Sequence, residues 1–456
     1  MSMITRRSSL ALVVSLVSVS AGSANDNWLD TYRQPAARII AAATATDDAW
    51  QRLALITDTF GPRLSGSAAL EATLRWAADE MKKDFDEVRL DPVMVPHWVR
   101  GSESLEMVTP QGGMLAMLGL GNSIGTGGAP VEGEVLVVRS FAELEANAAR
   151  AKGRIVLFNV PYTTYGETVQ YRSSGPSRAA ARGAIAMLVR AVGPPGLRTP
   201  HTGGLRYTAD QPQIPAAAIA TEDADRLQRM QDRGTRVVLR LRMDASFLPD
   251  AQSANLVAEY RGRDLPDEIV AIGCHIDSWD VGAGATDDGG GCVAMWEAVR
   301  VLKSLGLRPR RTIRVVFWTN EENGLRGGLA YRDKYKDQLS KHVMMLESDG
   351  GVFRPSGFGF SGPERGRAVV TQIGSLLAPI AADRIGPSGG GADIGPSVEA
   401  GDIPAMSLDV DGSKYFLIHH TQADTVDKID PQDLARCVAA VGVMSYVIAD
   451  MPQTLR

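Results

Sequence analysis

The chain has 456 residues with 44% hydrophobic content, enough to bury more than one ordinary core, so we expect at least two domains. Its 48 basic and 53 acidic residues give a net charge of −5, and no Lys/Arg stripe interleaved with aromatic residues runs along it. This composition excludes a disordered chain and argues against a nucleic-acid partner.

The first 24 residues have the pattern of a secretory signal peptide. Arg6 and Arg7 precede an apolar run at 10–19, and small residues follow at 21–24. This order predicts a secreted or periplasmic protein. No Asn-x-Ser/Thr acceptor occurs, so a bacterial periplasm or exterior fits better than a eukaryotic secretory route. Residues 25–44 form a candidate pro-segment or linker.

No later apolar run approaches the roughly 18 residues that a membrane span needs, so we expect no membrane association. The three cysteines, Cys274, Cys292 and Cys437, allow one disulfide at most. Cys292 and Cys437 lie in apolar helical patterns, where we expect buried structural thiols rather than reactive ones.

Residues 45–99 are expected to form the first part of a larger domain, with helices around the turn TFGPRLSGS. From about 100 to 248 the pattern changes to short β-rich runs separated by dense Pro and Gly, for example EVLVVRS and RIVLFNV. One stretch there, AARGAIAMLVRA, has a helical pattern. We expect 100–248 to be a smaller β-rich domain inserted into the larger one.

Strands and helices alternate in the last part of the chain, 249–456. Buried-strand patterns occur at 268–274, 312–319 and 342–348, and helical patterns at 291–306 and 325–339. Such alternation predicts an α/β domain with a mixed, largely parallel sheet flanked by helices. In sheets of this kind the ligand crevice lies beyond the carboxyl ends of the strands.

Acidic and histidine side chains follow one strand after another in this domain. They are His275 and Asp277, Glu321 and Glu322, Asp349, the pair Asp287 and Asp288 on a glycine-rich turn, and His419 and His420 after a further apolar run. Singly these signals are weak, because an Asp before a helix is often only an N-cap. Gathered in one crevice, the carboxylates would raise one another's pKa unless cations neutralised them. A metal centre is the simplest interpretation.

Histidine and carboxylate ligands without paired thiolates favour zinc, with cobalt or manganese also compatible. A set of five ligands drawn from these residues is more than one tetrahedral catalytic ion with an open position can use. They suit two ions that share a bridging carboxylate.

Several strings together resemble the di-zinc exopeptidases that include bacterial leucyl aminopeptidase. They are GPRLSGS, GCHIDSWDVGAGATDDGGG, FWTNEENG, LESDGG, GGGADI and YFLIHHTQADT. A second set resembles more narrowly the secreted, dipeptide-cleaving carboxypeptidase branch of that family: PHWVRG, LGLGNSIGT, VQYR, TPHTGG, DSWD, LGLRPRRT and SYVIADM. The similarity runs from about residue 45 to the C-terminus. It implies a zinc exopeptidase fold with an inserted protease-associated-like domain, two Zn²⁺ per chain and a homodimer.

The resemblance also implies roles for single residues. One zinc would be held by His275 and Asp349, the other by Glu322 and His420, and Asp287 would bridge them. Two further residues would serve catalysis: Glu321 as the general base and Asp277 as the carboxylate that fixes the imidazole of His275. A cis peptide between Asp287 and Asp288 is implied as well.

Two choices between neighbours remain. His420 is preferred to His419 because the family's ligand precedes an Asp-Thr pair by four residues, as His420 precedes Asp424. We expect alternation along a strand to turn His419 to the opposite face. Asp287 fits the bridging position after Gly-Ala-x, and Asp288 is expected to cap the following helix or support the site.

Other residues receive weaker interpretations. His97, His201 and His342 have no carboxylate-rich partner at a strand exit and are expected to be structural or on the surface. The segment 389–394 is a candidate loop near the substrate, where Asp393 could orient a ligand or contact a substrate amine; a flexible turn explains it nearly as well.

The sequence therefore predicts an exported di-zinc exopeptidase that hydrolyses dipeptides or short peptides, with Glu321 moving the proton. Alternatives are an aminopeptidase acting on longer peptides, a one-zinc glutaminyl cyclase and a receptor-like scaffold without activity. The string at Ser65 to Ser67 loosely suggests a serine hydrolase, but no Gly-x-Ser-x-Gly elbow follows a strand there, so we interpret it as a loop.

Overall fold

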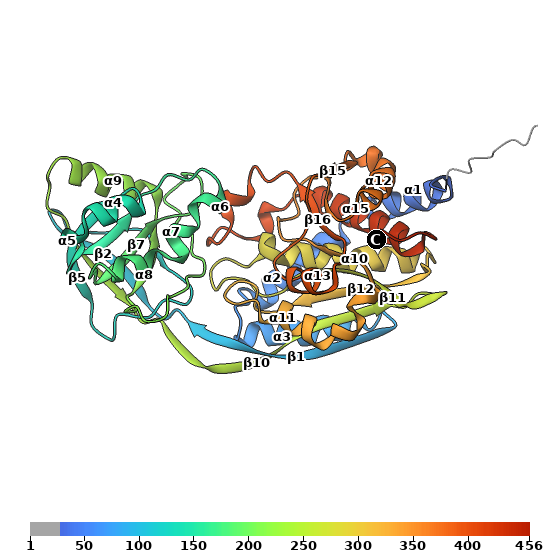
Figure 1. The fold of residues 1–456 in the computed structure, drawn as a ribbon, viewed down its shortest axis with the longest axis horizontal. Helices are drawn as coiled ribbons and strands as arrows, with labels where there is room; N and C mark the ends of the chain where they lie inside the picture. Colours follow the sequence, from blue (N-terminus) through green and yellow to red (C-terminus); the bar gives the residue numbers. More distant parts are fainter. Residues whose placement is uncertain (1–27) are drawn as a thin grey trace, which may run out of the picture.

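Two eight-stranded sheets, each covered by helices, organise the chain into two bodies joined side by side (Figure 1). This computed structural model describes residues 28–456. The segment 1–24, predicted to be a signal peptide, lies outside the described residues.

The sheet of the larger body has the order β1-β10-β12-β11-β13-β16-β14-β15. Its four central strands, β12, β11, β13 and β16, are parallel, and antiparallel strands flank them on both sides. This arrangement confirms the predicted mixed, largely parallel sheet. The strands are β1 Glu87–Val99, β10 Ser246–Tyr260, β11 Leu265–His275, β12 Arg311–Trp318, β13 His342–Glu347, β14 Pro355–Ser361, β15 Arg384–Gly386 and β16 Ala405–Val410.

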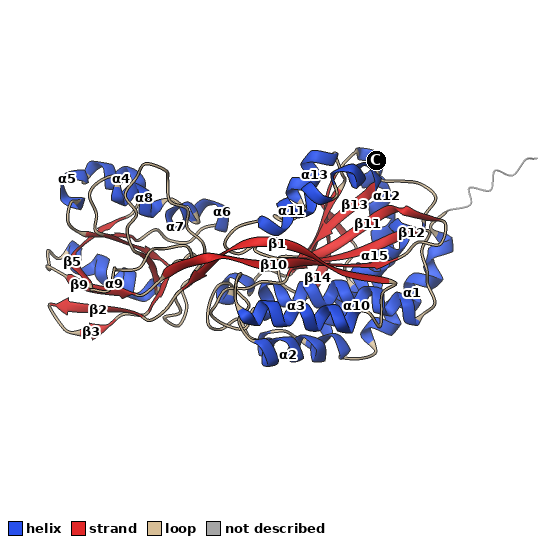
Figure 2. Ribbon diagram, turned by 90° about the horizontal axis from the view of Figure 1, so that it is seen from below, coloured by secondary structure: helices blue, strands red, loops and turns tan. Residues whose placement is uncertain are grey.

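Helices cover both faces of this sheet, as Figure 2 shows. Along β11, Val270 and Ile272 pack into the core beneath α10 and α15, whereas Ile269 and Ala271 pack toward α11 and α13 on the other face. Successive side chains of the strand point to opposite faces, and both faces are covered. The sequence of the strand is therefore a continuous apolar run. The helices are α1 Asp30–Thr44, α2 Asp48–Phe60, α3 Ala68–Met81, α10 Gly290–Ser304, α11 Arg326–Lys334, α12 Glu364–Gly374, α13 Gly395–Gly401, α14 Tyr415–Ile418 and α15 Pro431–Asp450, with a π-helical segment at Ala285–Gly289 and short 3₁₀ helices at Lys336–Lys341, Ser375–Ile380 and Val426–Lys428.

Helix α15 corrects one expectation. Its 20 residues, with a mean hydropathy of 1.3 in the most apolar window, are long and apolar enough to cross a membrane, although we expected no such run. In the structure 83% of that window is buried. The helix is apolar because it packs against α1, α10 and the sheet in the centre of the core.

The second body holds the sheet β3-β2-β9-β5-β6-β7-β8-β4, built from residues between 103 and 243. The long strands β1 and β10 form a ribbon that leads from one body to the other (Figure 2). The strands of the second sheet are β2 Glu103–Thr109, β3 Gly113–Met114, β4 Met117–Gly119, β5 Val131–Val138, β6 Ile155–Phe158, β7 Ala186–Arg190, β8 Ala216–Ile219 and β9 Val238–Met243. Its helices are α4 Phe141–Ala146, α5 Ala148–Ala151, α6 Tyr165–Thr168, α7 Gln170–Ser173, α8 Gly175–Ala180 and α9 Thr221–Asp232.

The helical interpretation of AARGAIAMLVRA is wrong. Helix α8 ends at Ala180, the chain turns at Gly183 with a φ of +77°, and Ala186–Arg190 is the fully buried parallel strand β7. A short apolar run does not reveal by its periodicity whether it is a buried strand or a buried helix.

The part of the candidate pro-segment that the structure describes forms helix α1. Tyr32, Ala36 and Ile39 of this helix are buried, and the helix packs against α10 and α15. These residues therefore belong to the core of the larger body.

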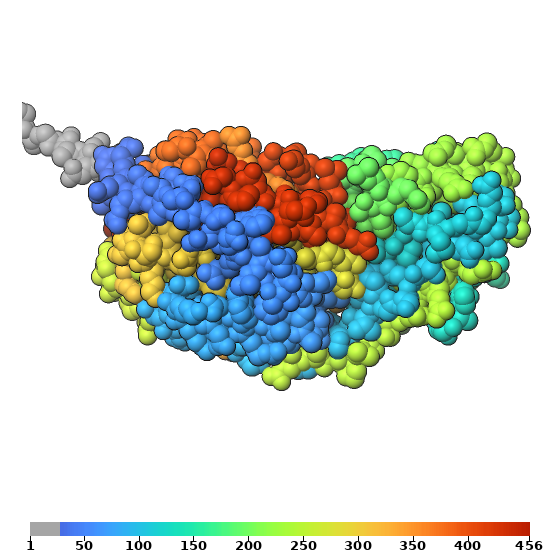
Figure 3. Space-filling model, turned by 180° about the vertical axis from the view of Figure 1, so that it is seen from behind, coloured from blue at the N-terminus to red at the C-terminus, as the bar shows by residue number. Residues whose placement is uncertain are grey.

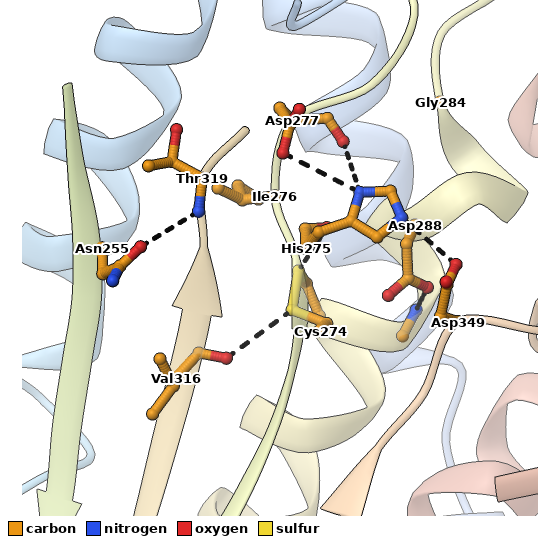
Figure 4. The surroundings of a disulfide bond; sticks show 12 residues. Asn255, Cys274, His275, Ile276, Asp277, Gly284, Asp288, Val316, Thr319 and Asp349 are labelled. Atoms are coloured by element: carbon orange, nitrogen blue, oxygen red, sulfur yellow. Dashed lines mark hydrogen bonds and ion pairs between the residues drawn. A yellow bond between two sulfur atoms is a disulfide. The ribbon is translucent and has the colours of Figure 1, made fainter. Parts of the chain in front are cut away.

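The cysteines also differ from expectation. Cys274 and Cys292 form a disulfide that joins the end of β11 to helix α10 (Figure 4). Cys292 is thus not the free structural thiol that its helical pattern suggested, because β11 passes directly beside the first turn of that helix. Cys437 is free and buried, as expected.

Candidate metal centre

Three parallel strands end together at one edge of the larger sheet. His275, the last residue of β11, pairs in register with Trp318 of β12, and Gly273 pairs with Glu347 of β13. The residues that follow these strands, including Glu321, Glu322 and Asp349, therefore leave the sheet at the same edge. The acidic and histidine side chains that follow separate strands in the sequence therefore lie at one edge of the sheet in the structure.

His275 lies between two carboxylates. Its Nε2 is 3.1 Å from Asp287 Oδ1 and 3.2 Å from Asp349 Oδ1 (Figure 4 shows the contact with Asp349). Burial alone would lower the pKa of His275, but Asp349 and Asp287 outweigh it and raise that pKa well above the usual value. All three side chains offer one donor atom within 4.8 Å of one another, a suitable arrangement for a metal ion.

A second group of donors lies on the other side of Asp287. Nε2 of His420 is 3.2 Å from Asp287 Oδ2 and 3.1 Å from Glu322 Oε2. Burial, followed by the charge of Asp287, raises the pKa of Glu322 to about 7. Asp287 therefore faces one candidate site with each of its two oxygens.

The expectation for His419 is wrong. The apolar run before it is the short helix α14 and not a strand, so His419 and His420 do not alternate. Their rings stack 3.5 Å apart, and Nε2 of His419 is 3.6 Å from Asp287 Oδ2. Asp287, His419 and His420 form the second group of metal-compatible donors. His420 remains the better candidate, since it alone of the two contacts Glu322 as well as Asp287.

Asp277 contacts the imidazole of His275 through two oxygens, of which the backbone carbonyl is nearer than the carboxylate. Nδ1 of His275 lies 2.9 Å from the backbone carbonyl of Asp277 and 3.9 Å from its carboxylate. The carboxylate accepts hydrogen bonds from the backbone N–H groups of Glu321 at 3.1 Å and Glu322 at 3.3 Å. Asp277 thus orients the His275 ring through its main chain and the two glutamates through its side chain.

Glu321 faces the same cavity as the metal-compatible residues. Burial, together with the neighbouring charges of Asp349 and Glu322, raises the pKa of Glu321 well above its usual value. Several buried carboxylates so close together need positive charge to remain ionised. The donor set and its charge both fit a centre for two cations.

Asp288 caps helix α10: its carboxylate accepts a hydrogen bond from Gly291 N at 3.1 Å. The peptide between Asp287 and Asp288 is cis, as the resemblance implied.

Comparison with known proteins identifies the family. A model of peptidase family M28 matches residues 255–444. Carboxypeptidase Q of Xenopus laevis is 45% identical over 434 residues, which cover 94% of this chain and 92% of that protein. The chain belongs to peptidase family M28. This confirms the resemblance and the expectation of a peptidase.

Solved structures support the M28 fold. A peptidase M28 precursor from Shewanella amazonensis SB2B is 32% identical, with a TM-score of 0.89 over 94% of this chain and 98% of that one. A zinc aminopeptidase from Bacillus subtilis is 20% identical and has a TM-score of 0.67 over 88% of this chain and 94% of that one. At this identity the second match shows the shared fold alone.

The M28 centre opens into a cavity of about 990 Å³ between the two bodies. The larger body contributes residues around Asp287, Glu321, Asp349 and His420, and the second body contributes residues from 165–174 and 204–208. Seen from behind, the C-terminal segments, coloured red, lie beside the green segments of the second body (Figure 3). Backbone bonding joins them, since Thr202 N donates to the His420 carbonyl at 2.9 Å.

Two supports of the M28 centre were missed by sequence reasoning. The sequence indicated Asp424 only through its interval of four residues from His420. In the structure its carboxylate accepts hydrogen bonds from the backbone N–H groups of Thr286 at 2.7 Å and Asp287 at 3.1 Å. Arg63 is fully buried and donates to four backbone carbonyls, those of Gly61, Ile276, Ala283 and Gly284. Burial lowers the pKa of Arg63 to about 10, so the guanidinium stays charged at neutral pH. A lone buried Arg in a turn gives no sequence signal of such a role.

The loop around Ser65 also supports the centre. Ser65 Oγ lies 3.4 Å from the Asp277 carboxylate and accepts a hydrogen bond from Asn320 at 3.1 Å. The interpretation of this string as a loop agrees with these contacts.

The remaining candidates belong to neither donor group. His342 is bound by Tyr331 Oη and the Gln338 carbonyl, His97 packs against Gly66, and His201 packs against Gly193 and contacts the backbone of His419. Asp393 is 1% exposed, its carboxylate oxygens have no hydrogen-bond partner among the described residues, and its neighbour Ala392 lines the cavity. Burial and the charge of Glu347 raise the pKa of Asp393 well above its usual value.

Proposed function

We propose that the protein is an exported exopeptidase that uses two zinc ions to hydrolyse dipeptides or other short peptides. The observation that carries this proposal is the position of Asp287 between two groups of metal-compatible donors, with Glu321 lining the same cavity. Membership in peptidase family M28 and the similarity to carboxypeptidase Q support it.

The residues in place fit two cations. His275 and Asp349 would hold one ion, Glu322 and His420 the other, and each oxygen of Asp287 would face one of them. When bound, the metal pair supplies Lewis-acid activation of water and of the peptide carbonyl. Histidine and carboxylate ligands without thiolates suit zinc.

Glu321 would take the proton from the attacking water and pass it to the leaving amine. Two features of the chain support this role. Glu321 lines the cavity, and Asp277 binds the backbone N–H groups of both Glu321 and Glu322, which fixes the turn that carries them. Adjacent glutamates on a fixed turn can point to different sides, one toward a metal and the other toward the reacting water.

The division of the chain supports the proposed preference for short substrates. We propose a catalytic domain made of residues 45–99 and 249–456, to which helix α1 also belongs, with 100–248 inserted as a domain that covers the cavity. Because helices and loops of the second body form the far wall, a long peptide would meet that wall before it passed the metal centre.

The pattern of residues 1–24 supports export to the periplasm or the medium, with cleavage near residue 24. The resemblance to the carboxypeptidase branch supports a homodimer. Light scattering of the mature protein should give twice the mass of one chain, and a monomeric mass at micromolar concentration would count against this part of the proposal.

A panel of dipeptides and tetrapeptides with free, N-acetylated or C-amidated ends tests the function. Zinc-loaded protein should hydrolyse free dipeptides fastest, and a chelator should abolish the activity until zinc is restored. Preferential release of N-terminal residues from tetrapeptides would favour an aminopeptidase instead. Equal rates whichever terminus is blocked would exclude exopeptidase action altogether.

A further inference from the structure

We propose that Arg172, on helix α7 of the second body, binds the C-terminal carboxylate of the substrate. This inference rests on the proposed function. It decides which end of the peptide the enzyme recognises, because a residue that binds the carboxylate selects peptides by their C-terminus.

The charges of the cavity are segregated between its two walls. The wall formed by the larger body carries the acids Asp287, Glu321, Glu322 and Asp349. The charged residues on the opposite wall are both cations, Arg172 and Arg206. A dipeptide has opposite charges at its two ends, so its carboxylate is attracted to the wall of the second body.

The charge of Arg172 is not balanced by an anion in the described part of the chain. It is 6% exposed, and it pairs with no carboxylate among residues 28–456. Its Nη2 donates to Tyr165 Oη at 2.8 Å, its Nη1 donates to the Thr202 carbonyl at 3.4 Å, and its Nε has no partner within the part of the chain that the structure describes. A guanidinium has five N–H donors, so this buried cation keeps several of them for a ligand. Burial of an unpaired charge is costly, and a bound carboxylate would offset that cost.

The guanidinium is held close to the metal centre. The Thr202 carbonyl oxygen that accepts from Arg172 lies 3.3 Å from Nδ1 of His420, whose other nitrogen faces Asp287 and Glu322. Adding the two contacts to this oxygen, 3.4 Å and 3.3 Å, limits the separation of Arg172 Nη1 from His420 Nδ1 to about 6.7 Å.

One residue beyond the scissile bond spans a distance of this order. An extended residue covers roughly 3.3–3.6 Å, and a hydrogen bond to the guanidinium adds roughly 2.9 Å. A carboxylate one residue after the reacting carbonyl can therefore lie in the part of the cavity that Arg172 lines.

The surroundings of Arg172 are shaped for a flat guanidinium. A Cβ atom on Gly203 would lie 2.3 Å from Nη1, so only glycine leaves room for it. Tyr165 stacks on Phe416 of the larger body, with ring centroids 5.3 Å apart, and its hydroxyl holds Nη2. Tyr165 therefore acts as a positioning residue for Arg172.

The test compares a dipeptide with its C-terminal amide. For the wild type, we expect the KM of the free acid to be at least about tenfold below that of the amide. Arg172→Gln should raise the KM of the free acid by about ten- to a hundredfold, the value of a hydrogen-bonded charged group, and change the KM of the amide little. Arg172→Lys should recover part of the lost affinity for the free acid, because lysine keeps the positive charge but lacks the planar guanidinium that can bind both carboxylate oxygens.

A binding measurement separates recognition from turnover. In a Glu321→Gln background, titration calorimetry should detect binding of the dipeptide, and the added Arg172→Gln change should abolish it while metal content stays constant. Arg178→Gln is the matched control, since Arg178 lies on the neighbouring helix α8 against Phe141, outside the cavity lining, and should change nothing. Should Arg172→Gln fail to fold, Tyr165→Phe is expected to raise the KM of the free acid alone by several-fold.

Failure of the clamp and failure of the function are distinguishable. Metal-loaded wild type that hydrolyses none of these peptides would overturn the proposed function. Wild type that hydrolyses acid and amide equally, with Arg172→Gln unchanged, would overturn the clamp and leave the peptidase in place. Loss of activity on N-acetylation, with amidation tolerated, would also overturn the clamp.

Discussion

Arg63 allows the organisation of the metal centre to be tested through stability. Its guanidinium donates four hydrogen bonds, at 2.7 to 3.0 Å, to the backbone carbonyls of residues 61, 276, 283 and 284. An Arg63→Lys protein keeps the charge but has three donors at most, so at least one buried carbonyl loses its partner. Each such bond to a charged group is worth about 1.5–3 kcal/mol.

We therefore expect Arg63→Lys to lower the free energy of unfolding by about 1.5–3 kcal/mol or more. Arg63→Met removes all four bonds, at about 6–12 kcal/mol, and also removes the cation that balances Asp424, Asp277 and Asp288. Since whole domains are stable by about 5–15 kcal/mol, this variant should fail to accumulate as folded protein.

Denaturant unfolding of metal-free protein, followed by circular dichroism, measures the change for Arg63→Lys. Arg182→Lys is a suitable control, because Arg182 is 40% exposed on its side chain and, among residues 28–456, pairs only with Glu145, so its replacement should cost less than about 1 kcal/mol. The free energy of unfolding of Arg63→Lys could instead lie within 0.5 kcal/mol of the wild-type value, roughly the noise of such additive comparisons. The conclusion that Arg63 holds these backbone segments together would then be wrong.

Two further predictions concern the core and the response to pH. Ile39→Ala in helix α1, at a site with no exposed surface, should lower the free energy of unfolding by about 2–5 kcal/mol, and the half-buried Ile40 should lose clearly less; equal and small losses would contradict the packing of α1 into the core. Burial lowers the pKa of His342 to about 4 from an unfolded value of 6.5, so the unfolded state binds more protons between these values and stability should fall as pH drops from 6.5 to 4, by up to about 3 kcal/mol. His342→Gln should flatten that slope in pH-dependent unfolding, and an unchanged slope would assign it to other groups.

The sequence predicted the parts of the structure that depend on buried apolar runs. Strand β11 ends at His275 and β12 leads into Glu321 because a buried strand stops where polar side chains begin, and parallel pairing brings those ends together. The mixed sheet could therefore be predicted from alternating runs, and the candidate ligands from their positions after them.

Contacts between distant segments could not be predicted in this way. The four-residue helix α14 reads like a strand, so the stacking of His419 on His420 was missed. Cys292 reads as a thiol in an apolar helix, although its partner Cys274 comes from a neighbouring strand. Arg172 reaches the cavity from a stretch about a hundred residues away from the metal motifs, and no local pattern links the two.

Whether Glu321 moves the proton beside a pair of metal ions can be decided by one paired measurement. Metal content by mass spectrometry and dipeptide turnover are compared for Glu321→Gln and Glu322→Gln. We expect two metals per chain and almost no turnover for Glu321→Gln, and a loss of bound metal for Glu322→Gln, because Glu322 contacts His420. Retained dipeptide hydrolysis in Glu321→Gln with both metals bound would contradict this role of Glu321.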